Sequence, residues 1–77
     1  MPPLPTLSGL EVVRVFESLG WQVVRQQGSH IILIKPGNFA SLSIPNHREV
    51  AKGTLRSLIR SAGLGVAEFV TVVQTRR

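Results

Sequence analysis

Residues 21–35, WQVVRQQGSHIILIK, hold two β-strand patterns on either side of a short turn. The second pattern, residues 30–35, is rich in β-branched aliphatic residues, which favour a strand over a helix. The first, residues 21–26, alternates as a strand does, and Gly28 supplies the freedom that a tight turn needs. We therefore expect two antiparallel strands here. In the first strand, the residues expected on one face are Trp21, Val23 and Arg25, with Val24 on the other.

A third strand is expected directly after these two. Pro36-Gly37-Asn38 is a strong turn sequence, and residues 40–44 form a shorter strand pattern in which Leu42 and Ile44 share a face. Pro45 stops this strand, because a proline has no N–H group to donate. Three strands with short connections predict an antiparallel meander.

Helical patterns flank the three strands. Ser8 and Glu11 fit a capping box, and Gly20 is well placed to end the helix that follows. Between them, apolar residues recur at helical spacing. A second helix should begin between residues 52 and 54. Its expected core stripe, at spacing i, i+3, i+4 and i+7, is Leu55, Leu58, Ile59 and Ala62.

Residues 66–74 are expected to form a short closing helix with Phe69 and Val73 turned inward. The β-branched run at residues 70–73 leaves a strand as the alternative. The order α-β-β-β-α(α) predicts an α+β sandwich, with helices on one face of a three-stranded antiparallel sheet. The other face of the sheet would stay open and could hold a polymer.

A chain of 77 residues is expected to form one domain. Three early prolines predict a Pro-rich, flexible lead over residues 1–7, followed by a single domain over 8–74 and a basic tail over 75–77. The sequence has no cysteine, no apolar run long enough to span a membrane and no signal-peptide pattern. We expect a cytoplasmic protein that has no contact with membranes.

The charge balance indicates a polyanionic partner. Nine Lys and Arg residues stand against four acidic ones, giving a formal net charge of +5. Nucleic acid is favoured over a membrane surface, although Arg76 and Arg77 make part of the excess a property of the tail. The four glutamates are scattered without the spacing of metal ligands, so we expect neither a metal ion nor a cofactor.

His30 is the candidate catalytic residue, because it opens an apolar strand in which packing does not call for a polar ring. Histidine can accept and donate a proton near neutral pH, and RNA carries its own nucleophile, the 2′-hydroxyl. Ser29 and nearby backbone amides could hold a phosphoryl oxygen. The plainer interpretation is a hairpin turn at Gly28-Ser29 followed by a half-exposed strand residue. No aspartate is present to orient His30 for serine-hydrolase chemistry.

His47 lies in a loop that enters a helix, where it either caps or solvates the turn or serves as a second proton-transfer group or substrate contact. Trp21 is expected at the edge of the core rather than as a platform for stacking a base.

Several residues are candidates for contact with RNA phosphates. Lys52, Arg56 and Arg60 repeat every four residues and form a basic ridge along the second helix, although a solvated helix face is the ordinary alternative. Gly53-Thr54 could offer free amides at the helix start or merely cap it. The further candidates are Lys35 and Arg48.

These motifs together resemble the HicA toxin family of bacterial mRNA interferases. The resemblance covers nearly everything from Ser8 to about Val70. It rests on Leu19-Gly20-Trp21, Arg25-Gln26-Gln27-Gly28-Ser29-His30, Ile44-Pro45-Asn46-His47, Lys52-Gly53-Thr54-Leu55-Arg56-Ser57-Leu58-Ile59-Arg60, Ala62-Gly63-Leu64 and Glu68-Phe69.

The resemblance implies a fold similar to double-stranded-RNA-binding domains, metal-independent endoribonuclease activity on mRNA, and growth arrest unless a HicB-like antitoxin binds. The family's catalytic histidine falls on His30, and the Gly-Ser before it on Gly28 and Ser29. Two other functions stay open: an RNA-binding module that does not cut, and a protein-interaction domain whose basic face meets an acidic partner.

Overall fold

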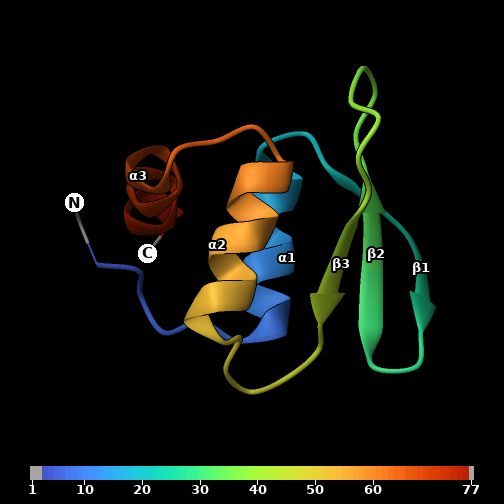
Figure 1. Cartoon of the computed structure of the whole chain (residues 1–77), viewed down its shortest axis with the longest axis horizontal. Coiled ribbons are helices and arrows are strands. Elements are labelled where there is room, and N and C mark those ends of the chain that lie inside the picture. Colours follow the sequence, from blue (N-terminus) through green and yellow to red (C-terminus); the bar gives the residue numbers. More distant parts are fainter. Residues whose placement is uncertain (1–2, 77) are drawn as a thin grey trace.

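The structure is a computed structural model that describes residues 3–76. These residues form three helices and a three-stranded antiparallel sheet (Figure 1). The α+β class and the element order are as predicted. The structure also confirms the C-terminal segment as a helix rather than a strand. The elements are α1 (Gly9–Ser18), β1 (Gln22–Gln27), β2 (His30–Ile34), β3 (Leu42–Pro45), α2 (Lys52–Ser61) and α3 (Val66–Arg76).

Helix α1 begins and ends as its sequence predicts. The Glu11 N–H donates to the Ser8 hydroxyl (3.2 Å), and the Ser8 N–H donates to the Glu11 carboxylate (2.9 Å), which completes the capping box. After α1 the chain reverses through Gly20, whose φ of 98° suits glycine far better than any other residue. This reversal sets Trp21 into the core, 3% exposed, with its ring edge-on to Phe16. The core interpretation of Trp21 is therefore confirmed.

The sheet has the order β1-β2-β3, with one face covered and one open. Ile31 and Leu33 of β2 are buried on the covered face, together with their β3 partners Ile44 and Leu42. Residues 30, 32 and 34 therefore point to the open face, because side chains alternate along a strand.

Strand β1 departs from the predicted alternation. The pairing with β2 shifts between Val23 and Arg25, so Val24 is an extra residue in a β-bulge. All six residues of β1 are exposed. The prediction that Val23 and Arg25 share a face is therefore wrong. Val23 pairs with the buried Leu33, and Arg25 pairs with Ile32 on the open face.

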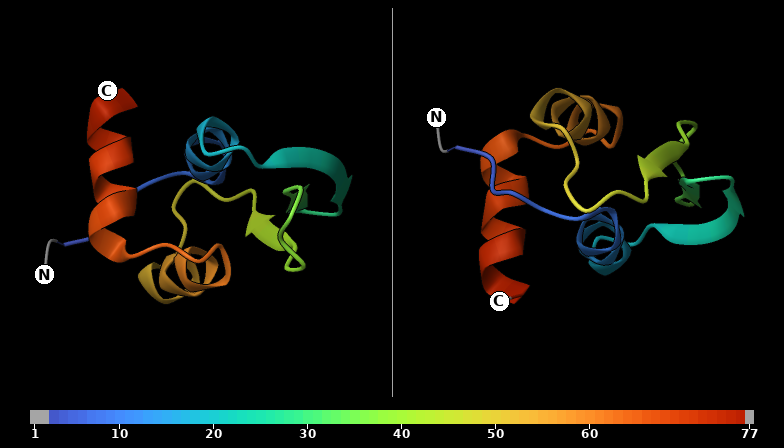
Figure 2. Two further views of the ribbon diagram at one scale, coloured as in Figure 1. Left: turned by 90° about the horizontal axis from the view of Figure 1, so that it is seen from above. Right: turned by 90° about the horizontal axis from the view of Figure 1, so that it is seen from below.

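The helices form two layers on the covered side of the sheet. Helices α1 and α2 pack against the strands, and α3 packs on α1 and α2 from the side away from the sheet (Figure 2). Phe69 of α3 is fully buried and its ring centroid lies 5.5 Å from that of Phe16. The core is thus shared by all three layers. Within residues 3–76, no helix is long and apolar enough to cross a membrane.

The structure differs from the expected flexible lead at residues 3–7, whereas residues 1 and 2 lie outside the described part. Leu4 and Leu7 are 7% and 2% exposed, and the Val50 N–H donates to the Leu7 carbonyl (2.8 Å). The Lys52 ammonium donates to the Pro5 carbonyl and to the Thr6 hydroxyl, both at 3.1 Å. Prolines lower the chain's helical and strand propensity, but they do not prevent leucines between them from being buried. Of the expected basic tail, Thr75 and Arg76 belong to α3, and Arg77 lies outside the described residues.

Candidate active site

His30 is the first residue of β2, directly after the Gly28-Ser29 turn. Gly28 has φ of 57°, and the Gln26 side-chain amide donates to its carbonyl oxygen (3.2 Å). The His30 backbone pairs with Gln27 on one side and Pro45 on the other. Its ring is exposed on the open face of the sheet. The geometry therefore presents a titratable ring to solvent from a backbone that is fixed on both sides.

A chain of backbone contacts joins the His30 turn to the loop that carries His47. The Asn46 N–H donates to the Ser29 carbonyl oxygen (2.7 Å), and the Gly9 N–H donates to the His47 carbonyl oxygen (2.8 Å). The start of α1 lies so close to this loop that a Cβ on Gly9 would overlap the Pro45 carbonyl oxygen. The turn, the loop and the first residue of α1 are thus held together at one end of the domain, at the bottom of Figure 1.

The start of α2 completes this end of the domain. Residues 46–49 are all exposed, and the buried Val50 anchors the loop before the helix begins at Lys52. The N-cap residue, Ala51, makes no side-chain hydrogen bond to the first turn. Helix N-termini favour anions, because their first N–H groups point outward without helical partners. The structure therefore brings His30, Ser29, Gly28, His47, Arg48, Gly53 and Thr54 to the same end.

Two of the predicted cations do not belong to this cluster. Lys35 follows the far end of β2, about 16 Å along the strand from His30. Its Cε lies 3.3 Å from where a Gly20 Cβ would stand, so its side chain runs beside the α1–β1 connection. Lys52 starts at the right end, but its ammonium is bound to the N-terminal segment. Its observed contacts are therefore structural ones.

Arg56 and Arg60 are exposed one and two turns further along α2. With Ile59, Leu64 and Val66 they line a shallow cavity of about 250 Å³ where α2 meets the start of α3. The ridge expected from the sequence therefore consists of two free guanidinium groups rather than three cations. It leads away from His30 along the flank of α2 that faces α3.

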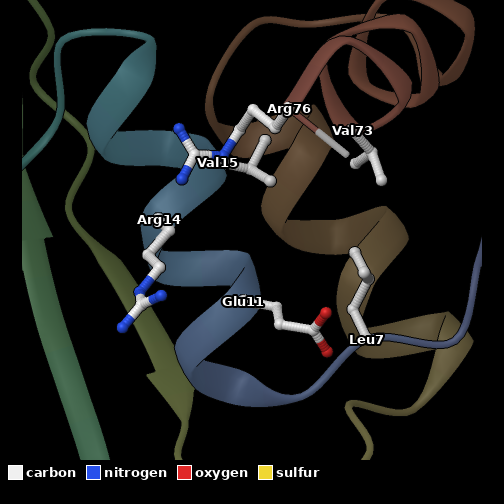
Figure 3. A pocket seen from close by; sticks show the side chains of 6 residues that line it. All are labelled: Leu7, Glu11, Arg14, Val15, Val73 and Arg76. Atoms are coloured by element: carbon white, nitrogen blue, oxygen red, sulfur yellow. The ribbon is translucent and has the colours of Figure 1, made fainter.

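A second cavity, of about 160 Å³, lies between α1, α3 and the N-terminal segment (Figure 3). Arg14 and Arg76 stand at its rim, and Leu7, Val15 and Val73 supply its apolar lining, with Glu11 at its lower side. None of these residues belongs to the sheet or is one of the candidate site residues.

Residues 3–76 contain no group of three or more His, Cys, Asp or Glu side chains that could hold a metal ion. The end with His30 offers imidazole rings, hydroxyl groups, backbone amides, a guanidinium group and the carboxylate of Glu49.

Phe39, which no sequence motif singled out, is fully exposed at 108%. It stands in the loop between β2 and β3, at the opposite end of the sheet from His30 (Figure 1). An aromatic residue directly after the Pro36-Gly37-Asn38 turn is the signal that could have found it, since a turn places its neighbours at the surface.

Two of the comparisons with known proteins found similar proteins, both from bacterial toxin–antitoxin systems. A family model described as HicA toxin of bacterial toxin–antitoxin systems matches residues 9–64. One chain of a solved toxin–antitoxin complex from Streptococcus pneumoniae is similar at a TM-score of 0.67 and 34% sequence identity. The similarity covers 75% of this chain and 98% of that chain. The comparison with curated proteins gave no match. The matched residues contain the whole end of the domain that carries His30.

Proposed function

The chain belongs to the HicA toxin family of bacterial toxin–antitoxin systems, and from this membership we propose that it is a metal-independent endoribonuclease that cleaves mRNA. The observation that carries the proposal is the placement of His30. An exposed imidazole stands on a backbone that is paired on both sides, directly after a glycine turn and at the same end of the domain as the start of α2 (Figure 1). A nuclease that uses the 2′-hydroxyl of its substrate needs this combination of a proton-transfer group and anion-stabilising groups.

In the proposed reaction the 2′-oxygen attacks phosphorus and the bond to the 5′-oxygen breaks. The 2′-hydroxyl must lose a proton, and the departing 5′-oxygen must gain one. His30 acts as the general acid or base for one of these transfers. His47, two residues beyond the strand partner of His30, is the candidate for the other. The Ser29 hydroxyl and the amides of the turn stabilise the negative charge that develops on the phosphoryl oxygens.

The RNA backbone is held at the same end of the domain in this proposal. Arg48 and the first turn of α2, at Gly53 and Thr54, contact phosphates next to the scissile one. Arg56 and Arg60 extend the phosphate contacts along α2. Such contacts fix the position of the RNA without reading its sequence. Lys35 and Lys52 are not included, because of the placements described above.

A toxin of this kind has to be silenced in the cell that makes it. The solved relative comes from a toxin–antitoxin complex. By analogy, we expect a HicB-like antitoxin to bind this chain, cover His30 and offer acidic groups to the basic residues of α2. The gene next to that of the toxin is the place to look for it. This chain would act inside the cytoplasm, where mRNA is found.

The test of the catalytic assignment compares His30→Ala with His47→Ala on labelled mRNA in the presence of EDTA. Loss of a general acid or base costs about 10²- to 10⁴-fold in rate, so His30→Ala should abolish detectable cleavage and toxicity. Because His30 is exposed, the variant should remain folded and still bind RNA and antitoxin. Undiminished cleavage by His30→Ala would refute the assignment. If the wild-type protein binds RNA but never cuts it, the chain is the non-catalytic RNA-binding module instead.

A further inference from the structure

The open face of the sheet adjoins the candidate active site without interruption. Its central row consists of His30, Ile32 and Ile34 of β2, of which Ile32 is half-buried and Ile34 is 43% exposed. Arg25 of β1 lies opposite Ile32 on one side, and Ser43 of β3 lies opposite it on the other. The helices all lie on the other side of the sheet, with α1 and α2 packed against it (Figure 2). His30 is therefore one end of a larger exposed surface.

The charge and polarity of this face suit an anionic polymer. Arg25 supplies a guanidinium group, while Gln27 beside His30 and Gln22 beside Ile34 supply amides that can donate and accept hydrogen bonds. The four glutamates of the chain lie on α1, on α3 and in the loop before α2, so none of them stands on the sheet. An aliphatic centre flanked by a cation and amides can accommodate bases and sugars as well as phosphates.

Phe39 lies in the connection between β2 and β3, at the opposite end of the sheet from His30 (Figure 1). Ile34, the last residue of β2, lies about 13 Å along the strand from His30, and the loop with Phe39 projects beyond it (Figure 1). The loop is ordered by its own hydrogen bonds. The Asn38 N–H donates to the Lys35 carbonyl (3.1 Å), and the Ala40 N–H donates to the Asn38 side-chain oxygen (2.9 Å). Because the Phe39 side chain is fully exposed, a base can approach either face of its ring, and these hydrogen bonds hold the backbone next to it.

We propose that an unpaired segment of the RNA substrate, adjoining the scissile phosphate, lies along the open face of the sheet from His30 to Phe39, where a base stacks on the Phe39 ring. This inference rests on the proposed nuclease function and names its substrate class as single-stranded RNA. Stacking on an exposed aromatic ring requires a base that is free of its duplex neighbours. The RNA then crosses the end of the domain at His30, with one arm along the sheet and the other over the start of α2.

A protein partner on the same face is the competing occupant. RNA is favoured because the face is continuous with His30 and carries a guanidinium group and amides but no carboxylate. The exposed rings of His30 and Phe39 also stand at opposite ends of the sheet. Separate stacking positions are spaced in this way, whereas the anchors of a protein interface cluster near its centre.

The experiment measures binding separately from cleavage. Fluorescence anisotropy with His30→Ala protein compares a labelled single-stranded oligoribonucleotide with the same strand annealed to its complement. Adding Phe39→Ala should weaken binding of the single strand about five- to a hundredfold, because stacking on an aromatic residue contributes about that much per base. Phe39→Trp should retain the affinity. Leu10→Ala is the matched control, since Leu10 is an exposed apolar residue (54%) that belongs to α1 and not to the sheet or the β2–β3 loop.

The outcomes separate this inference from the proposed function. Unchanged affinity of Phe39→Ala for the single strand, or equal binding of the duplex, would overturn the proposed RNA path along the sheet even if the wild-type protein cuts RNA. A loss of antitoxin binding by Phe39→Ala without a loss of RNA binding would overturn it in favour of a protein interface. Conversely, weakened RNA binding by Phe39→Ala in a protein that never cuts RNA would support the proposed RNA path along the sheet and refute the proposed nuclease activity. Thermal unfolding checks that each variant is folded, which is expected because Phe39 makes no buried contact.

Discussion

Replacing Gly9 by alanine tests whether the candidate active site is built on the close contact between α1 and the loop after β3. Gly9 is the first residue of α1, where helix propensity alone would make alanine better by up to about 1 kcal/mol. The structure predicts the opposite sign. A Cβ at this position would overlap the carbonyl oxygen of Pro45, a backbone atom that cannot rotate away.

The expected magnitude follows from two costs and one gain. Inserting a methyl group into a packed contact costs about 1–3 kcal/mol. A displaced loop also weakens the hydrogen bond from the Gly9 N–H to the His47 carbonyl, which contributes about 0.5–1.5 kcal/mol. Against the gain in propensity, we expect Gly9→Ala to lower the free energy of unfolding by about 1–3 kcal/mol. For a chain of this size each kcal/mol lowers Tm by about 4–8 °C.

Gly53→Ala is the matched control, because Gly53 is the second residue of α2 and a Cβ there would meet nothing within 4 Å. This variant should be stabilised by about 0.4–1 kcal/mol. Urea and thermal unfolding of both variants give the comparison. Cleavage by Gly9→Ala should also fall, at a temperature where the variant is fully folded, because the loop with His47 has moved. A Gly9→Ala protein as stable as the wild type would refute the reasoning.

Three further predictions concern the cations and the antitoxin. Lys52→Met should lower the free energy of unfolding by about 1 kcal/mol and speed hydrogen exchange at residues 4–7, since the ammonium is bound to Pro5 and Thr6. RNA affinity should hardly change. A loss of RNA affinity without a loss of stability would contradict this prediction. Arg56→Ala and Arg60→Ala are each made in a His30→Ala background. Each should reduce the magnitude of the slope of log affinity against log salt by about 0.7–0.9. An unchanged slope in the double variant would mean that these two arginines form only a solvated helix face. Hydrogen exchange of residues 28–31 should slow when the product of the neighbouring gene binds, and unaltered exchange there would exclude occlusion of the His30 turn.

Local sequence signals predicted the elements whose causes are local. The capping box at Ser8 and Glu11, the reversal at Gly20 and the buried stripe of Leu55, Leu58 and Ile59 all follow from spacing of a few residues. The antiparallel order of the strands likewise follows from short connections.

The features that sequence analysis missed depend on contacts between distant segments. Leu7 is buried next to α1 and α3, and the binding of Lys52 to Pro5 joins residues 47 positions apart. The bulge at Val24 depends on the register with β2 and has no signal in a run of alternating residues. For the site, the motif identified His30. The approach of the His47 loop, fixed by Gly9 and Asn46, became apparent only in the folded chain.

The same long-range effects divided the predicted cations. The four-residue spacing of Lys52, Arg56 and Arg60 placed them on one side of α2, as found. It could not indicate that the N-terminal segment binds the first of them, or that the other two flank a cavity at α3. Spacing along a helix defines a face but not what that face meets.

The chemical ends of the cleavage products test the central claim most directly. RNA cut by the wild-type protein in EDTA should carry a 2′,3′-cyclic phosphate and a 5′-hydroxyl, because the 2′-oxygen attacks and the 5′-oxygen leaves. A substrate with 2′-deoxyribose at the cleaved nucleotide should resist cutting at that position, and His30→Ala should yield no products. Products with 5′-phosphate ends, or cleavage of the deoxy-substituted substrate, would contradict the account.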